Sequence, residues 1–297
     1  MKNLNKHAYL IMAYNNFDFL KKLLSLLDDE RNDIFIHIDE RAVDFEESAF
    51  KNCTKYSKLI FIPRHVVYWA DYSQTNVQLE LLKYACENDT YKYYHLISGS
   101  DLPLKTQNQI HDFLDDKNYE FVGICPDEVW YCLRRVKFYH PLVHNKHFRN
   151  SKFLKGMDRL FEYVQKLVGV NRLKNKDIKI VDGWNWFSIT DDFARYLLDK
   201  RSFIEKTFRK TIASDEMIVQ TMLINSDFYN RIYNKEDLVK GSLRYIDWSD
   251  EVERPRVFRE KDFDNLINCE EAIFARKFDP EKDSVIIEKL YNYIINA

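Results

Sequence analysis

Glycine is scarce in this sequence of 297 residues. Only six glycines occur, and no two of them are closer than 13 residues. Neither a G-x-G-x-x-G dinucleotide turn nor a Walker phosphate loop can be written with that spacing, which excludes dinucleotide dehydrogenases and P-loop kinases. A G-x-S-x-G elbow and an H-E-x-x-H motif are also missing. A ligand would therefore have to be held mainly by side chains.

Three further features are lacking, and each restricts the class of protein. The net charge of −2 shows no basic excess, so nucleic acid is not expected as a partner. The five cysteines form no C-x-x-C pair and fit free thiols in a reducing cytosol. No hydrophobic run approaches the roughly 18 residues of a membrane span, and the first apolar stretch resembles a strand more than a signal peptide. These features favour a cytoplasmic protein.

Positive charge is nevertheless concentrated locally. Residues 144–179 contain ten Lys or Arg and three acidic residues. Within this stretch apolar residues recur at helical spacing, at Met157, Leu160, Phe161, Val164, Leu167 and Val168. Such a basic amphipathic helix can lie on an anionic membrane, or it can pack its apolar side on its own domain and leave its basic side in water. We favour the second interpretation and keep the first open.

The first 125 residues alternate strand-like and helix-like segments, which is the pattern of a largely parallel sheet with helices on both faces. Strands are expected at residues 7–14, 33–38, 59–62, 93–97 and 119–124. Asn16, Ser73 or Thr75, and Thr106 are expected to begin the intervening helices. After a basic helical insertion at about residues 126–180, a strand at 184–189 and helices from 191, 215 and 281 follow. We predict a single α/β domain over residues 1–297.

Several ordered blocks resemble one family, the core-2/I-branching β-1,6-N-acetylglucosaminyltransferases and peptide O-xylosyltransferases of glycosyltransferase family 14. The resemblance covers residues 7–125 and 180–280 and implies a GT-A type, Rossmann-like mixed sheet. The block at 36–41 (IHIDER) is similar to the segment that meets the nucleotide in this family. It assigns Asp39 to the uridine and Arg41 to a nearby cationic role. Without the resemblance, a salt bridge within the turn explains the pair equally well.

Two blocks carry the roles expected around the transferred sugar. The loop at 94–105 (YHLISGSDLPLK) resembles a family loop that contains Asp101, which either meets the sugar or orders the loop. The segment at 183–187 (GWNWF) resembles the strand that lines the sugar, with Asn185 where the xylosyltransferases have Asp and Trp186 beside it. Trp248 falls where the family stacks the acceptor sugar.

The remaining blocks concern catalysis. Residues 214–216 (SDE) resemble the family segment whose Glu is the catalytic base, which implies that role for Glu216. Taken alone, the same three residues predict a helix capped by Ser214. Residues 274–279 (FARKFD) resemble the segment whose Lys binds the UDP diphosphate, here Lys277, together with Arg254 or Arg256.

The sequence also indicates whether a bound metal ion is expected. Many nucleotide-sugar enzymes hold Mg²⁺ or Mn²⁺ with an Asp-x-Asp pair after the fourth strand. This sequence has only Asp101 there, and its other such pair, Asp262 and Asp264, falls in a helix-like stretch that is expected to be solvated surface. No metal or other cofactor is therefore expected, and fixed cations would neutralise the departing UDP.

These residues imply an inverting, metal-independent glycosyltransferase. It would move a sugar, GlcNAc first and xylose second, from a UDP-sugar to a hydroxyl of a glycan or lipid-linked glycan and form a β-linkage. A metal-dependent enzyme using Asp101 or Asp39, and an inactive glycan-binding protein on the same fold, remain alternatives. The N-terminal anchor of the animal members is missing here, which favours a bacterial, cytoplasmic enzyme of surface polysaccharide or glycoconjugate synthesis. Contact of residues 144–179 with the inner face of the membrane stays open as an additional expectation.

Overall fold

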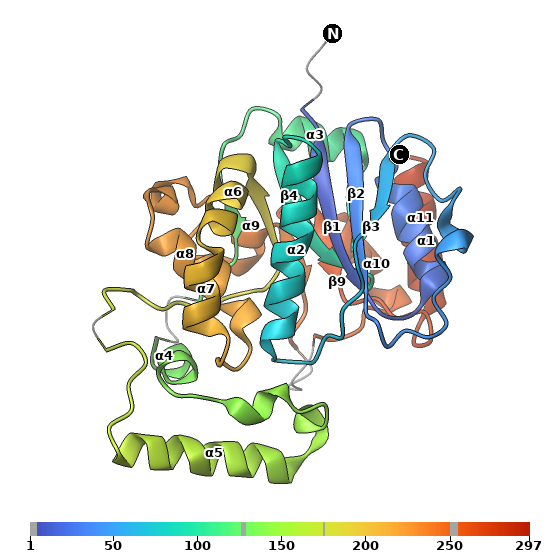
Figure 1. The fold of residues 1–297 in the computed structure, drawn as a ribbon. Coiled ribbons are helices and arrows are strands. Elements are labelled where there is room, and N and C mark those ends of the chain that lie inside the picture. Colours follow the sequence, from blue (N-terminus) through green and yellow to red (C-terminus); the bar gives the residue numbers. More distant parts are fainter. Residues whose placement is uncertain (1–4, 126–128, 175, 250–254) are drawn as a thin grey trace.

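Two sheets organise the chain in a computed structural model that describes residues 5–125, 129–174, 176–249 and 255–297. Within these residues a six-stranded sheet has the order β3-β2-β1-β4-β7-β6, and a three-stranded sheet has the order β5-β9-β8 (Figure 1). The strands are β1 His7–Ala13, β2 Asn32–Ile38, β3 Lys58–Phe61, β4 Tyr93–Ser98, β5 Asp101–Pro103, β6 Phe121–Val122, β7 Phe187–Thr190, β8 Arg244–Ile246 and β9 Phe274–Arg276.

The first four strands of the large sheet are parallel. β1 pairs in parallel with both β2 and β4, and β2 pairs in parallel with β3. β7 runs antiparallel to β4, and β6 runs antiparallel to β7. The carboxyl ends of β1, β2 and β4 therefore meet at one edge, where ligands of open α/β sheets bind.

Helices cover both faces of this sheet (Figure 1). The helices of the described residues are α1 Phe17–Leu27, α2 Tyr72–Asn88, α3 Gln107–Leu114, α4 Val129–Lys137, α5 Lys152–Leu167, α6 Asp191–Asp199, α7 Arg201–Phe208, α8 Ile218–Ile224, α9 Leu238–Ser242, α10 Phe263–Ile267 and α11 Ser284–Ile295. α4 and α5 lie below the sheet and not on its faces (Figure 1). The expected α/β fold of GT-A type, a mixed sheet with helices on both faces, is confirmed.

The alternation of side chains along β1 explains the two layers. Tyr9 and Ile11 belong to a core shared with α1 and α11, whereas Ala8 and Leu10 belong to a second core shared with α2 and α6. All four residues are fully buried. A strand that is apolar on both sides is typical of a parallel sheet covered on both faces.

The expected elements are present, but several boundaries and caps differ. Asn16 precedes α1 in a left-handed conformation (φ 55°) and makes no side-chain capping bond. α2 begins at Tyr72 because the Asp71 carboxylate accepts a hydrogen bond from the Ser73 amide at 2.8 Å. Thr106 does cap α3, within a capping box. The strand expected at 184–189 begins only at Phe187.

Arg244 joins the two sheets and was not singled out from the sequence. Its guanidinium lies in the interior and donates to the Leu96 carbonyl of β4 at 3.2 Å and to the Phe187 carbonyl of β7 at 2.5 Å. Burial lowers the pKa of Arg244 to about 9. These bonds fix the three-stranded sheet, which contains β9 and the block at 274–279, against the large sheet.

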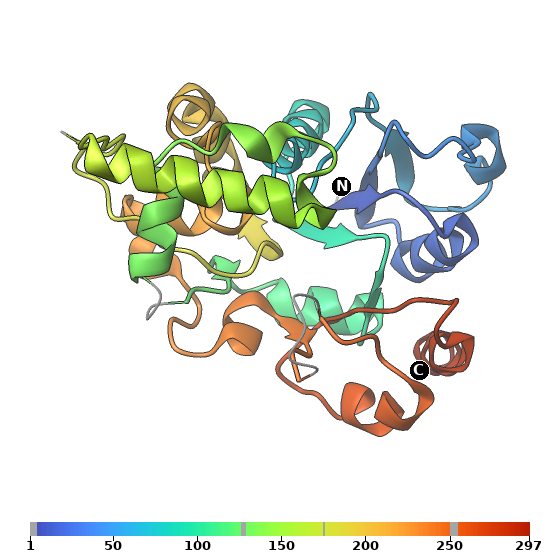
Figure 2. The same ribbon diagram turned by 90° about the horizontal axis from the view of Figure 1, so that it is seen from below.

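The basic helix is present as α5, but its apolar side does not pack on the domain. The side chains expected to form the packing stripe are exposed, among them Leu160 and Leu167. Figure 2 shows α5 lying across the lower side of the molecule, nearest to the viewer. The favoured interpretation of this helix was therefore wrong. No helix in the described ranges has the length and apolar character needed to cross a bilayer.

Candidate functional site

Two adjoining pockets open at the carboxyl edge of the large sheet. The strand-end pocket has a volume of about 440 Å³ and is lined by the residues that follow β1, β2 and β4. The Glu216 pocket has a volume of about 260 Å³ and is lined by Glu216 and the segment before β7. They share six lining residues, which are Trp69, Gln74, Arg149, Trp186, Arg276 and Lys277. The arrangement suits one ligand that extends from one pocket into the other.

Asp39 and Arg41 lie together in the strand-end pocket. The Asp39 carboxylate accepts hydrogen bonds from the Arg41 Nε at 3.0 Å and Nη2 at 2.7 Å, and from the Arg41 amide at 2.9 Å. Although burial opposes it, this bonding holds the pKa of Asp39 below its usual range. The salt bridge within the turn is therefore present. Both residues also line the pocket, and their roles toward uridine stay predictions.

Glu216 ends a single 3-10 turn, Ser214–Glu216, that two contacts hold in place. The Ser214 hydroxyl lies 2.9 Å from the Thr75 hydroxyl of α2, so Ser214 does not cap a helix with its side chain. The Gly183 amide donates to the Glu216 carbonyl at 2.8 Å. These bonds fix the Glu216 backbone directly beside the segment that leads into β7.

Arg135 of α4 fixes the Glu216 side chain. Its Nη2 atom lies 2.8 Å from Glu216 Oε2 and 2.6 Å from the Ala213 carbonyl oxygen, while Nη1 lies 3.1 Å from Asp182 Oδ2. The Arg135 side chain is only 5% exposed, whereas that of Glu216 is 47% exposed. A buried cation thus orients one oxygen of a carboxylate that still reaches solvent in the pocket.

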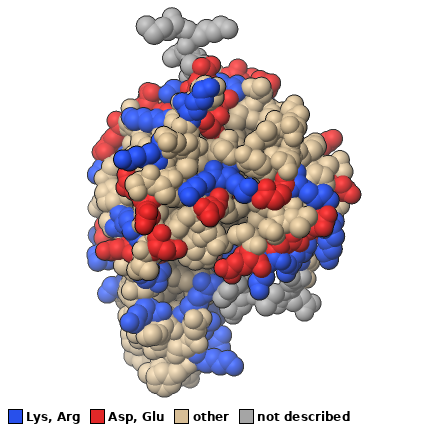
Figure 3. All heavy atoms as spheres, turned by 90° about the vertical axis from the view of Figure 1, so that its right-hand side faces the viewer, with Lys and Arg blue, Asp and Glu red and all other residues tan. Residues whose placement is uncertain are grey.

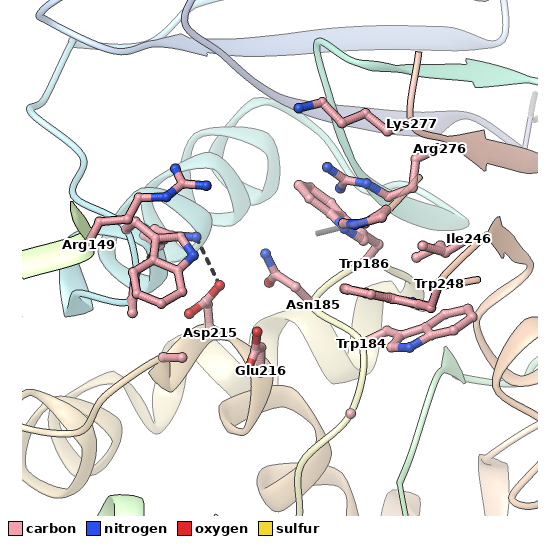
Figure 4. Close-up of a pocket in the computed structure, with 16 residues that line it drawn as sticks. Arg149, Trp184, Asn185, Trp186, Asp215, Glu216, Ile246, Trp248, Arg276 and Lys277 are labelled. Atoms are coloured by element: carbon pink, nitrogen blue, oxygen red, sulfur yellow. Dashed lines mark hydrogen bonds between the residues drawn. The ribbon is translucent and has the colours of Figure 1, made fainter. Parts of the chain in front are cut away.

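Asp215 is the most perturbed acid of the site. Burial raises the pKa of its carboxyl to about 7, and the adjacent Glu216 carboxylate adds to the rise. Asp215 Oδ2 accepts a hydrogen bond from Gln74 Nε2 at 2.9 Å (Figure 4). Two neighbouring carboxyl groups with different environments are common where an acid and a base are needed.

The segment before β7 forms one wall of the Glu216 pocket. Asn185 accepts a hydrogen bond from the Gln78 side chain of α2, and Trp184 and Trp186 flank it in the pocket. A Cβ atom on Gly183 would lie 2.0 Å from the Gly123 carbonyl oxygen, so only glycine fits there. The aromatic rings supply the flat apolar faces on which sugar rings pack.

Three cations stand at the junction of the pockets. Lys277 and Arg276 lie across the pocket from Glu216 and Asp215, and Arg149 approaches from another side (Figure 4). The guanidinium of Arg276 lies 4.1 Å from the centre of the Trp186 ring, and Arg149 lies 5.5 Å from that of Trp69. This placement of positive charge suits an anionic group such as a diphosphate.

Two predicted site residues that the structure describes, Asp101 and Arg256, are not brought into these pockets. Asp101 is 2% exposed, and its carboxylate accepts hydrogen bonds from the Ser98 amide and hydroxyl, both at 2.8 Å, so it orders the loop. Arg256 pairs with Asp247 at 2.6 Å and with Asp262 at 2.8 Å and is absent from the lining of both pockets. Arg254 lies outside the described residues.

Asp262 was expected to be solvated surface, and this expectation was wrong. It is 6% exposed because it accepts hydrogen bonds from both Arg256 and the Arg259 amide. Trp248, by contrast, lines the Glu216 pocket and is 49% exposed. Its role in acceptor stacking stays a prediction.

Sequence reasoning missed several residues that line or support the site. Arg149 belonged to the basic stretch and gave no signal of its own, and Arg135 lies in the same insertion-like region. Trp69 lies between the third strand and α2, where no motif marks it. Arg276 stands beside Lys277 in the block at 274–279, and this position is the one sequence signal that could have identified it.

The described residues contain no cluster of three or more His, Cys, Asp or Glu side chains placed to bind a metal ion. Asp39 and Asp101, the acids named for a metal-dependent alternative, are instead engaged by Arg41 and by the Ser98 loop.

The chain is similar to known glycosyltransferases over most of its length. It is 25% identical to rat xylosyltransferase 2 over 95% of this chain and 33% of the rat protein. It is 24% identical to the human N-acetyllactosaminide β-1,6-N-acetylglucosaminyl-transferase over 95% of this chain and 70% of the human protein. The chain thus spans about a third of the xylosyltransferases that it matches. Mouse xyloside xylosyltransferase 1 matches over 91% of this chain and 96% of its own at 10% identity, with a TM-score of 0.37.

A family model also matches most of the chain. The model described as "Branch: Core-2/I-Branching enzyme" matches residues 7–267, a range that runs from β1 through the basic region to α10 and includes Glu216. Since this match covers far more than half of the sequence, the chain belongs to the core-2/I-branching enzyme family of glycosyltransferases.

Proposed function

We propose that the protein is an inverting, metal-independent glycosyltransferase with a UDP-sugar as donor. Its acceptor is a hydroxyl of a glycan or lipid-linked glycan, the product linkage is β, and the setting is synthesis of a surface polysaccharide or glycoconjugate. GlcNAc is the first choice of transferred sugar and xylose the second, because relatives of both kinds match the chain. The observation that carries the proposal is one exposed carboxylate, Glu216, facing Lys277 and Arg276 across a pocket.

The chemistry follows from this opposition of charges. The acceptor oxygen forms a bond to the anomeric carbon while the bond from that carbon to the diphosphate oxygen breaks, and Glu216 takes the acceptor proton. Arg135 holds Oε2, so we assign the proton transfer to Oε1. A single displacement by the acceptor oxygen, with one carboxylate as the base, inverts the anomeric centre.

The departing UDP gains negative charge as the glycosidic bond breaks. Lys277, Arg276 and Arg149 line both pockets and would face this charge as it develops. Fixed cations in a recessed site stabilise a transition state without reorganisation. They can therefore do what a divalent cation does in other nucleotide-sugar enzymes, which supports metal independence.

A transfer assay in the presence of EDTA tests the metal question. With UDP-GlcNAc and UDP-xylose compared on the same acceptor panel, we expect full transfer after EDTA treatment and no gain on adding Mn²⁺. Transfer that disappears in EDTA and returns with Mn²⁺ would establish the metal-dependent alternative. Binding of UDP without transfer or hydrolysis of any UDP-sugar would establish the inactive alternative.

A further inference from the structure

α5 is attached to the protein by its polar side. Asp158 lies 2.7 Å from His140, and the Gln165 side chain exchanges hydrogen bonds of 2.8 and 2.9 Å with the Tyr139 backbone. Asp158 and Gln165 are each 4% exposed. Glu162 on the same side pairs with Arg134 of α4 at 3.1 Å. This is the reverse of an ordinary surface helix, which packs its apolar side inward.

The apolar side of α5 faces away from the protein. Its large side chains recur at i, i+3, i+4 and i+7 and are between 42% and 74% exposed, and they are Phe153, Met157, Leu160, Phe161, Val164 and Leu167. Tyr163 and Val168 extend the same surface. We call these eight residues the α5 apolar face. A contiguous apolar surface of this kind marks an interaction site.

Positive charge borders this face. Lys152, Arg159 and Lys166 are exposed along one edge of α5, while the acidic residues Asp158 and Glu162 are turned to the protein. Figure 3 shows Lys and Arg together with uncharged residues at the lower end of the molecule, and Asp and Glu higher on the body. An apolar helix face with a basic edge is complementary to an anionic lipid surface.

We propose that the α5 apolar face inserts into the interface of an anionic lipid bilayer, with α5 lying parallel to the membrane plane. Lys152, Arg159 and Lys166 then meet lipid headgroups. A second copy of the chain is a poorer occupant, because it would bring the same positive charge to the contact. α5 has 16 residues and is charged on one side, so it lies on the membrane and does not span it.

This docking places the pockets close to the lipid surface. Arg149, three residues before α5, lines both pockets, and Lys155 of α5 lies 5.5 Å from the ring centre of Trp69, which lines them too. On the proposed function, the acceptor is then a lipid-linked glycan presented from the same membrane. The docking itself does not depend on that function.

Vesicle flotation tests the docking with the full chain. We expect binding to vesicles of phosphatidylcholine with phosphatidylglycerol, weaker binding to phosphatidylcholine alone, and weaker binding to the anionic vesicles at high salt. The double substitution Leu160→Glu with Val164→Glu is expected to lower the partition coefficient at least about tenfold. The control is Val285→Glu with Ile295→Glu on α11, which changes similarly exposed apolar residues far from α5 (Figure 1). We expect this control to leave the partition coefficient unchanged.

Two outcomes would overturn the docking. One is absence of flotation with anionic vesicles, or flotation that the α5 double variant retains while circular dichroism shows it folded. The other is a dimer in light scattering that the α5 double variant converts to a monomer without any lipid binding, which would make a second copy the occupant. Failure of sugar transfer with intact flotation would count against the proposed function alone.

Discussion

Arg149 supplies positive charge to both pockets although it lies in the stretch that composition marks only as basic. Arg149→Met should weaken UDP binding about tenfold, because a charge-assisted contact to the diphosphate is lost. Lys152→Met removes an exposed charge three residues away that lines neither pocket and is the matched control. Isothermal titration calorimetry with UDP, in the absence of membranes, measures the affinity of both variants. Equal affinity of the two variants would place the diphosphate elsewhere.

Asp215 makes the stability of the folded protein depend on pH. Its pKa is raised to about 7 in the folded chain by burial and then by Glu216, against about 3.9 in an unfolded chain. The folded state therefore binds the proton more tightly, and stability falls as pH rises from about 4 to about 7. Asp215→Asn keeps an acceptor for Gln74 and should raise the melting temperature more at pH 8 than at pH 5. An equal change at both pH values would contradict the raised pKa.

At the scale of elements, the segment before β7 and the 3-10 turn depend on each other. The Gly183 amide bonds to the Glu216 carbonyl, and a Cβ at 183 would meet the Gly123 carbonyl oxygen at 2.0 Å. Gly183→Ala should lower the free energy of unfolding by about 1–3 kcal/mol and displace Glu216, so that transfer falls as well.

Gly156 provides the matched comparison for this substitution. It lies within α5, and no heavy atom lies within 4 Å of a Cβ built there. Gly156→Ala should raise the free energy of unfolding by about 0.5–1 kcal/mol, since alanine loses less backbone freedom in a helix. Urea unfolding measures both variants. A Gly183→Ala variant as stable as wild type would show that the segment before β7 is not tightly packed against Gly123.

The elements also show what the sequence can and cannot predict. Short, largely apolar runs locate β1, β2 and β4 because these strands are buried on both faces, and helical spacing locates α1 and α6 because each buries one side. They do not reveal which side of an amphipathic helix is attached to the protein. The attached side of α5 was predicted wrongly for that reason. Its orientation is decided by hydrogen bonds of Asp158 with His140 and of Gln165 with Tyr139, and no hydrophobic pattern encodes these contacts.

At the scale of the whole molecule, the fold assembles a site from blocks that are far apart in the sequence. Asp39, Asn185, Glu216, Trp248 and Lys277 were named from separate motifs and line two adjoining pockets. Residues without a motif could not be named in this way, because their place depends on packing. Arg135 reaches Glu216 from α4, across 81 positions of sequence, and no local pattern encodes that contact.

We propose above that Glu216 removes the acceptor proton while fixed cations stabilise the departing UDP. The most direct test compares wild type and Glu216→Gln in single-turnover transfer from the preferred UDP-sugar, with UDP affinity measured on the same samples. We expect transfer to fall by a factor of about 10² to 10⁴ and UDP affinity to stay within about twofold. Transfer by Glu216→Gln at the wild-type rate would contradict it.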